Sequence, residues 1–263
     1  MLLAVDIGNT NVVLALFHDE EVVNEWRINS DTKRTADEYI SILLSLFRDA
    51  GVRLSAIDES VMSTVVPQLL GPFIRVIERL TGKKPLVVNE SIYCKLPVEP
   101  PVTGRHEIGT DLICNAVEAY SLYKKSCIVV DFGTALTFTA INDQGNIEGV
   151  AITPGLGTAV TSLFSNAAQL PSVPLEAPPS SLGTNTIHSI QAGIVLGYKG
   201  LVESLIGRMK DDLHDKNGTE PAEIHVVATG GLNSVLKPIT DVFSHVDKQL
   251  TLKGLCRIAQ IVK

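Results

Sequence analysis

The chain opens with Leu2-Leu3-Ala4-Val5-Asp6-Ile7-Gly8-Asn9-Thr10, and it repeats this pattern as Cys127-Ile128-Val129-Val130-Asp131-Phe132-Gly133-Thr134. Each copy is an apolar strand, an Asp, a Gly turn with a hydroxyl residue, and then a second apolar strand. Glycine lets the backbone approach an anion closely. Turn amides and a Thr hydroxyl can donate to phosphate oxygens, and the Asp can hold a divalent metal that bridges them. The two copies predict a duplicated fold that binds one nucleoside triphosphate, and we interpret the chain as a phosphotransferase.

A structural explanation exists for each copy taken alone. Many hairpins carry Asp-x-Gly for turn geometry, and an Asp often caps a tight turn through its own backbone. For a single site that explanation is preferred. Two copies in matching strand contexts favour phosphate binding.

Composition narrows the function classes. The 263 residues are 45% hydrophobic and 19% charged, which is typical of well-filled cores, and the net charge of -7 argues against nucleic acid or an anionic membrane as partner. Cys94, Cys114, Cys127 and Cys256 show no C-x-x-C pairing and predict reduced thiols, not disulfides or a zinc site. Because Met1 leads straight into a strand and no apolar run reaches membrane-spanning length, we expect a soluble, cytoplasmic protein.

The first half of the sequence predicts strand-strand-strand-helix-strand-helix. The expected strands are 2–7, 11–17, 21–28, 60–66 and 85–88, and the expected helices are 35–50, 68–81 and about 110–123, after a loop over 97–107. The second half repeats the theme. Its expected strands are 127–132, 135–142, 147–153 and 223–229, and its expected helices are 157–170 and 187–213, with short elements closing the chain.

This repeated layout resembles that of the actin-like ATPase and sugar-kinase superfamily. The resemblance implies an α/β fold of two duplicated actin-like (ribonuclease H-like) domains, with mixed sheets flanked by helices and a nucleotide cleft between them. We expect a first domain over 1–118 and a second over 119–263.

Three further features have two interpretations each. Asp111 follows Gly109-Thr110 at the predicted start of a helix, where it is either a helix-dipole Asp or the base that accepts the proton of an attacking alcohol. Thr229-Gly230-Gly231 is either a plain turn or an adenosine contact. The glycines of the helix over 187–213 indicate either internal packing or a partner subunit. No Walker motif and no Ser-His-Asp order is present, and the histidines lack metal-ligand spacing.

Taken together, the motifs resemble those of the type III pantothenate kinases over essentially the whole chain. They are Asp6 to Asn11, Gly109-Thr110-Asp111 with Asn115-Ala116, Val130 to Thr137, Ile152 to Leu156, Gln169-Leu170-Pro171, Gly183 to Thr186, Gly193, Ala228 to Leu232, and Leu250 to Leu255.

The resemblance implies ATP-dependent phosphorylation of pantothenate to 4′-phosphopantothenate, the first step of coenzyme A biosynthesis. It also implies a homodimer, Mg²⁺, and a monovalent cation, either potassium or ammonium. Two alternatives remain: a phosphotransferase of the same fold acting on another small alcohol, and a catalytically weak nucleotide-binding regulatory homologue.

The resemblance also assigns roles by position. ATP and its phosphates are assigned to Asp6, Ile7, Gly8, Asn9, Thr10, Asn11, Val12, Val13, Gly133 and Thr134. Pantothenate is assigned to Gly109, Thr110, Asp111, Leu112 and Thr186, with Asp111 as the catalytic proton acceptor. Asp131 is expected at the monovalent cation, and Asp6 at Mg²⁺ through the phosphates.

The chain departs from the family pattern at three positions. Leu112 stands where the family usually has an Arg that pairs with the pantothenate carboxylate, and Thr139 stands where an Asp is common. The family usually carries a Tyr about ten residues before the catalytic Asp, yet none lies between Tyr93 and Asp111. We hypothesise that Arg105 or His106 supplies the missing charge, because a guanidinium-carboxylate pair is not replaced neutrally by an apolar side chain.

Overall fold

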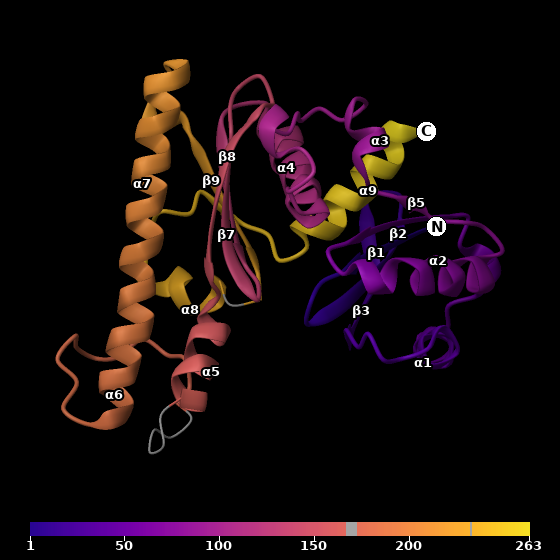
Figure 1. Cartoon of the computed structure of the whole chain (residues 1–263), viewed down its shortest axis with the longest axis horizontal. Coiled ribbons are helices and arrows are strands. Elements are labelled where there is room, and N and C mark those ends of the chain that lie inside the picture. Colours follow the sequence, from indigo (N-terminus) through magenta and orange to yellow (C-terminus); the bar gives the residue numbers. More distant parts are fainter. Residues whose placement is uncertain (167–172, 232) are drawn as a thin grey trace. The chain divides into compact units, whose positions relative to one another are not determined.

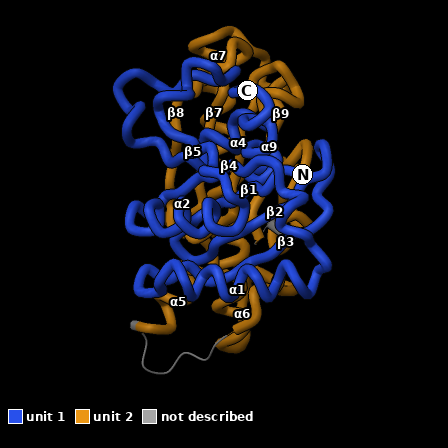
Figure 2. The backbone as a smooth tube through the Cα atoms, turned by 90° about the vertical axis from the view of Figure 1, so that its right-hand side faces the viewer, with its two compact units in different colours: residues 1–118, 250–263 blue, residues 119–249 orange. Residues whose placement is uncertain are grey.

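The computed structural model describes residues 1–166, 173–231 and 233–263. These residues form two compact units, Met1–Glu118 with Leu250–Lys263, and Ala119–Gln249 (Figure 2). Each unit contains one five-stranded mixed sheet. The motif residues Gln169, Leu170, Pro171 and Leu232, together with the end of the helix predicted over 157–170, lie outside the described residues.

The sheet of the first unit has the strand order β3-β2-β1-β4-β5. Its strands are β1 (Leu2–Ile7), β2 (Asn11–His18), β3 (Glu21–Asn29), β4 (Glu59–Thr64) and β5 (Leu86–Val87). The central strand β1 pairs antiparallel with β2 and parallel with β4. The predicted strands over 2–7, 11–17 and 21–28 are thereby confirmed almost to the residue.

Two amphipathic helices cover one face of this sheet. They are α1 (Ala36–Asp49) and α2 (Pro67–Thr81). A capping box between Thr35 and Glu38 begins α1, and Tyr39, Leu43 and Phe47 then recur at helical spacing along its buried side. These side chains pack in one core with alternate residues of β1 and with the apolar side of α2.

The first unit also contains α3 (Glu90–Tyr93), α9 (Leu250–Val262) and the first part of α4 (Thr110–Tyr123), up to Glu118. Because neighbouring strand residues point to opposite faces, Asp6 lies on the face away from α1 and α2. Helix α9 packs on β1, β2 and β4, and a Cβ on Gly254 would overlap the carbonyl oxygen of Cys114 in α4. The last helix therefore docks closely on the helix that precedes the second unit.

This placement of the C-terminal residues differs from the domain limits expected from the sequence. Those limits put 119–263 together, whereas Leu250–Lys263 clusters with the first unit and the second unit ends at Gln249. The physical reason is the apolar side of α9, where Leu252, Leu255 and Ile258 are buried.

The sheet of the second unit has the order β10-β9-β6-β7-β8. Its elements are β6 (Cys127–Phe132), β7 (Ala135–Ile141), β8 (Ile147–Pro154), α5 (Leu156–Asn166), α6 (Thr186–Gln191), α7 (Gly197–Asn217), β9 (His225–Gly230), α8 (Asn233–Leu236) and β10 (His245–Val246). A π-helical turn over Ala192–Leu196 joins α6 to α7, so the helix predicted over 187–213 is present with an irregular first half. Helix α7 runs along the sheet and buries Val202, Ile206 and Leu213 against it (Figure 1).

The two sheets have the same connectivity. Reading outward from the central strands, β1 with β2, β3, β4 and β5 matches β6 with β7, β8, β9 and β10. The duplication predicted from the two acidic turns is therefore present in the folded chain. Within the described ranges, no helix has the length and apolar character needed to cross a bilayer.

Candidate active site

The first acidic turn joins β1 to β2. Asp6 is partly buried near the end of β1, and its backbone pairs with Val13 on one side and Ser63 on the other. The Gly8 amide donates to the Asn11 carbonyl at 2.9 Å, which closes the turn and leaves Asn9 exposed at its tip. The turn therefore presents polar groups at the end of the strand that carries the carboxylate.

The second acidic turn joins β6 to β7. Asp131 pairs with Thr137 and Thr229, the positions that match Val13 and Ser63. The turn residues Gly133 and Thr134 are exposed. This turn is one residue shorter than the first, because Gly133-Thr134-Ala135 replaces the four residues from Gly8 to Asn11.

The Thr134 backbone is held in place by the segment that follows β8. Its carbonyl accepts from the Thr158 hydroxyl at 2.6 Å and from the Gly155 amide at 3.0 Å. The Thr134 side chain, which the sequence analysis assigned to phosphate, is thus carried on a backbone fixed by two hydrogen bonds.

Gly230 follows the strand beside Asp131 and is required there for two reasons. Its φ is +86°, a conformation that L side chains rarely adopt. A Cβ at this position would also lie 2.7 Å from Oδ1 of Asp131 and 2.6 Å from the Phe132 backbone. The Thr229-Gly230-Gly231 turn therefore brings the backbone against the Asp131 carboxylate.

Asp111 occupies the first turn of α4 in the first unit. Its Oδ1 accepts from the Leu112 amide at 2.8 Å, and burial raises the pKa of the Asp111 carboxyl above its ordinary value. A raised pKa makes a carboxylate a better proton acceptor. The geometry and the electrostatics agree with the hypothesis of a general base.

The two residues before Asp111 hold it against the end of β4. The Thr110 hydroxyl accepts from the Thr64 amide and donates to the Thr64 carbonyl, both at 3.2 Å. A Cβ on Gly109 would overlap Oδ1 of Asp111. The Asp111 carboxylate lies over Gly109, in space that the Cβ of any other residue type would occupy. The next side chain, Leu112, is buried.

Asp111 and Arg105 both act electrostatically on Tyr93. Burial is the main cause that raises the pKa of Tyr93 to about 12; the Asp111 charge adds to this shift, and the Arg105 charge opposes it. Tyr93 lies outside the spacing expected from the family, yet the fold brings it within charge range of Asp111. His106, the other candidate cation, is bound to Glu90.

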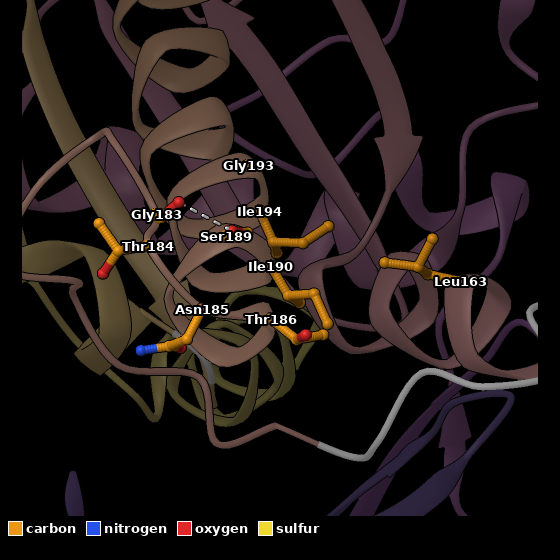
Figure 3. A pocket seen from close by; sticks show the side chains of 9 residues that line it. All are labelled: Leu163, Gly183, Thr184, Asn185, Thr186, Ser189, Ile190, Gly193 and Ile194. Atoms are coloured by element: carbon orange, nitrogen blue, oxygen red, sulfur yellow. Dashed lines mark hydrogen bonds between the residues drawn. The ribbon is translucent and has the colours of Figure 1, made fainter.

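Thr186 lies at the start of α6 in the second unit, where it lines a cavity of about 520 Å³. Leu163 of α5 lies opposite Ile190 and Ile194 of the helical segment, so the cavity has an apolar side (Figure 3). The remaining lining residues are Gly183, Thr184, Asn185, Ser189 and Gly193. The backbone carbonyl of Gly183 accepts from the Ser189 hydroxyl at 3.3 Å, which ties the loop to the helix.

The acidic residues offer few ligands to a metal. Among the residues that the structure describes, no three His, Cys, Asp or Glu side chains gather into a metal-binding group. Mg²⁺ commonly takes one or two carboxylates and completes its shell with substrate phosphates and water. The partly exposed Asp6 fits that manner of binding.

Comparison with known proteins decides the family. A family model described as "Type III pantothenate kinase" matches residues 2–208. The type III pantothenate kinase of Geobacter sulfurreducens (strain ATCC 51573 / DSM 12127 / PCA) is 42% identical over 259 residues, which are 97% of this chain and 96% of the relative. The enzyme of Moorella thermoacetica (strain ATCC 39073 / JCM 9320) is 42% identical, with 97% of each chain covered. The chain belongs to the type III pantothenate kinase family.

Solved structures place this family member in the actin-like fold. A Sinorhizobium meliloti protein described as a 2-dehydro-3-deoxygalactonokinase matches with a TM-score of 0.54 and 12% identity, covering 99% of this chain and 96% of that one. The ethanolamine utilization protein EutJ from Carboxydothermus hydrogenoformans matches with a TM-score of 0.51 and 13% identity, covering 97% and 88%. At such identities the likeness concerns the fold alone. Membership of a kinase family further implies ATP and a divalent metal.

The structure locates several candidate residues of this kinase family member within each unit, and their roles stay predictions. Asp6 and Asp131 occupy matching strand positions, and Thr110 and Asp111 meet the end of the strand beside β1. Sequence reasoning did not identify Ser63, which lies 57 residues after Asp6 in the chain and donates its hydroxyl proton to the Asp6 carboxylate. The available signal was the end of the predicted strand over 60–66, which runs parallel to β1 in this architecture.

Proposed function

We propose that this chain transfers the γ-phosphoryl group of ATP to pantothenate and forms 4′-phosphopantothenate, the first step of coenzyme A biosynthesis, in the cytoplasm. The observation that carries the proposal is the equivalent placement of Asp6 and Asp131 in two sheets of the same connectivity. It occurs in a chain with full-length relatives in the type III pantothenate kinase family. Phosphoryl transfer requires positioning and charge neutralisation more than covalent chemistry.

The two acidic turns bind the phosphates of ATP in this proposal. The segment from Asp6 to Val13 holds them through its amides and hydroxyls, and Gly133 with Thr134 contributes donors from the second unit. Mg²⁺, when bound, neutralises phosphate charge, and Asp6 is the residue that would hold it. Asp131 would hold a monovalent cation, potassium or ammonium, beside Thr137, whose buried hydroxyl has no hydrogen-bond partner among the described residues.

Asp111 accepts the proton of the attacking pantothenate hydroxyl. Burial favours this role because it raises the pKa of the Asp111 carboxyl. The Thr110 bridge to β4 and the absence of a Cβ at Gly109 fix where that carboxylate lies. These residues orient the base and need no further chemistry of their own.

Arg105 is our candidate for recognising the pantothenate carboxylate in place of the Arg that the family usually has at Leu112. Arg105 and Asp111 both act on the pKa of Tyr93, and this shared neighbour is the observation that supports the candidate. Leu112 is buried and carries no charge, so it contributes apolar packing to this end of the site.

We also propose a homodimer in which Thr186 serves the partner subunit. The second unit exposes large apolar side chains at Leu182, Ile187 and Ile152, and exposed apolar patches mark interaction sites. The Asp111→Asn and Thr186→Ala variants, each impaired alone, test this arrangement when mixed. Recovery of activity on mixing supports a shared site, and no recovery contradicts it.

The function itself is tested by coupled ADP release with Mg²⁺ and ammonium, comparing pantothenate with a panel of small alcohols. Turnover on pantothenate supports the proposal. Turnover only on another alcohol would mean that pantothenate is not the acceptor. The apolar Leu112, in place of the Arg that the family usually has, is the reason to test this alternative. ATP binding without turnover on any acceptor would indicate a regulatory homologue.

A further inference from the structure

Ser63 contacts the carboxylate of the first acidic turn from the neighbouring strand. Its hydroxyl donates to Oδ1 of Asp6 at 2.5 Å, and its backbone is paired with Asp6 in the parallel register of β1 and β4. The Ser63 side chain is completely buried. It therefore contacts the carboxylate from the protein interior and does not reach solvent or substrate directly.

The hydrogen bond has a defined direction. An ionised carboxylate only accepts hydrogen bonds, so the single Ser63 proton must point at Asp6. Hydrogen bonds to a carboxylate are shorter and stronger than those between neutral groups, and 2.5 Å lies in that range. This contact fixes the rotation of the carboxylate about its own axis.

Cys114 of α4 supports Ser63 from behind. The thiol is fully buried and is hydrogen-bonded to the Ser63 side chain. Burial raises the pKa of Cys114 well above its ordinary value, and the Asp6 and Asp111 charges raise it further, so the group remains a neutral thiol. Ser63 thus lies between a thiol and a carboxylate, with both neighbours fixed by secondary structure.

The second unit has a hydroxyl residue at the matching position. Asp131 pairs with Thr229 in the parallel register of β6 and β9, as Asp6 pairs with Ser63. Thr229 is also buried. Both copies of the duplicated fold therefore place a short hydroxyl side chain beside the Asp of the acidic turn.

We propose that Ser63 is a positioning residue that holds the Asp6 carboxylate in the orientation in which it receives the Mg²⁺-bound phosphates of ATP. This inference rests on the proposed function of Asp6. Ser63 acts through Asp6 and touches no substrate. Because supporting hydrogen bonds to a metal-binding carboxylate typically change metal affinity or activity by about 10-fold to 100-fold, the effect is measurable.

Calorimetric binding of a non-hydrolysable ATP analogue tests the inference without any acceptor substrate. The titration is made with Mg²⁺ and again with EDTA, using wild type, Ser63→Ala and Ser63→Thr. We expect Ser63→Ala to weaken Mg²⁺-dependent binding by about 10-fold or more while binding in EDTA changes little. Ser63→Thr keeps the hydroxyl and is expected to recover most of the affinity.

Ser60→Ala is the matched control. Ser60 lies on the same strand and is also buried, and its hydroxyl has no partner within the described residues. It is expected to leave Mg²⁺-dependent binding unchanged. A purely structural Ser63 would instead lower the melting temperature in Ser63→Ala and leave the Mg²⁺ dependence at the wild-type value, and this result overturns the inference.

The proposed function and this inference fail separately. Wild-type binding of the Mg²⁺-nucleotide without turnover on pantothenate contradicts the function but leaves the Ser63 test valid. Turnover on pantothenate by a Ser63→Ala variant with wild-type Mg²⁺ dependence contradicts only the role of Ser63. Absence of Mg²⁺-dependent nucleotide binding in wild type contradicts both.

Discussion

Asp6 and Asp131 occupy the same position in two sheets of equal connectivity. Each lies one residue before the end of the central strand, and each is flanked by an antiparallel and a parallel neighbour in corresponding registers. The turns after them differ by one residue, and the Gly amide donates within the turn in both. The same strand-turn arrangement thus occurs twice, and we propose that both copies bind phosphate.

Asp111→Asn is expected to stabilise the folded chain at neutral pH. Because the folded pKa of Asp111 is raised above its ordinary value of 3.8, its contribution favours folding at low pH and is lost as the pH rises through the folded pKa. Asparagine does not ionise, so the variant keeps its stability as the pH rises. Thermal melting should show a higher melting temperature for the variant near pH 7, with the difference shrinking towards acid pH.

The control for this melting series is Asp49→Asn, which removes a carboxylate whose side chain is 70% exposed. Its melting temperature near pH 7 should stay close to that of wild type, because the carboxylate is exposed to solvent. If the melting temperature of Asp111→Asn follows that of this control, burial does not raise the pKa of the Asp111 carboxyl.

Gly109→Ala is expected to reduce kcat because the new methyl group would overlap Oδ1 of Asp111 and displace the carboxylate. Misplacement of a catalytic group by about 1 Å can lower the rate by about 100-fold. Steady-state kinetics should show this loss with little change in the KM for ATP. Gly104→Ala serves as control, since the nearest atom to its Cβ would be 3.8 Å away; equal activity of both variants would contradict the steric argument.

Arg105→Ala is expected to raise the KM for pantothenate while leaving the KM for ATP unchanged. Loss of a hydrogen bond to a charged group costs about 1.5–3 kcal/mol, which corresponds to about 10-fold or more in KM. The companion variant His106→Ala removes the neighbouring cation candidate, which is bound to Glu90. An unchanged KM in Arg105→Ala would show that this guanidinium does not replace the one missing at Leu112.

Arg257→Ala is expected to destabilise the first unit. Arg257 of α9 donates to both oxygens of Glu118 at 2.6 and 3.1 Å, and Glu118 is only 3% exposed. Removing the cation leaves a buried carboxylate without its partner, which typically costs about 3–5 kcal/mol. Urea denaturation measures the loss.

Lys263→Ala provides the comparison for that denaturation experiment. Lys263 pairs with Glu59 at 2.7 Å, but both side chains are substantially exposed, so the loss should stay within about 1 kcal/mol. A similar loss in both variants would mean that the Arg257–Glu118 pair is not the contact that docks α9.

The local elements of this fold could be predicted from sequence because their signals are local. The apolar runs of β1 and β2, the alternation of β3 and the spacing of Tyr39, Leu43 and Phe47 are visible in short windows. Helix α9 was not predicted as a helix. Its sequence carries Gly254 in the middle, and only the contact with the Cys114 backbone explains why a glycine belongs there.

The candidate site was predicted only where its residues fall in one segment. The two acidic turns and Gly109-Thr110-Asp111 are contiguous patterns. The Ser63 contact to Asp6 and the nearness of Tyr93 to Asp111 depend on strand pairing and loop folding across long stretches of chain. Spacing rules carry no information on such contacts.

The most direct test of the proposed mechanism is pantothenate-dependent ADP release by wild type and Asp111→Asn, measured with Mg²⁺ and a monovalent cation across a pH series. We expect wild-type kcat/KM to rise with pH through the raised pKa of Asp111, and the variant to lose about 100-fold to 10,000-fold in kcat/KM. Wild-type turnover that survives intact in Asp111→Asn would contradict the proposed mechanism.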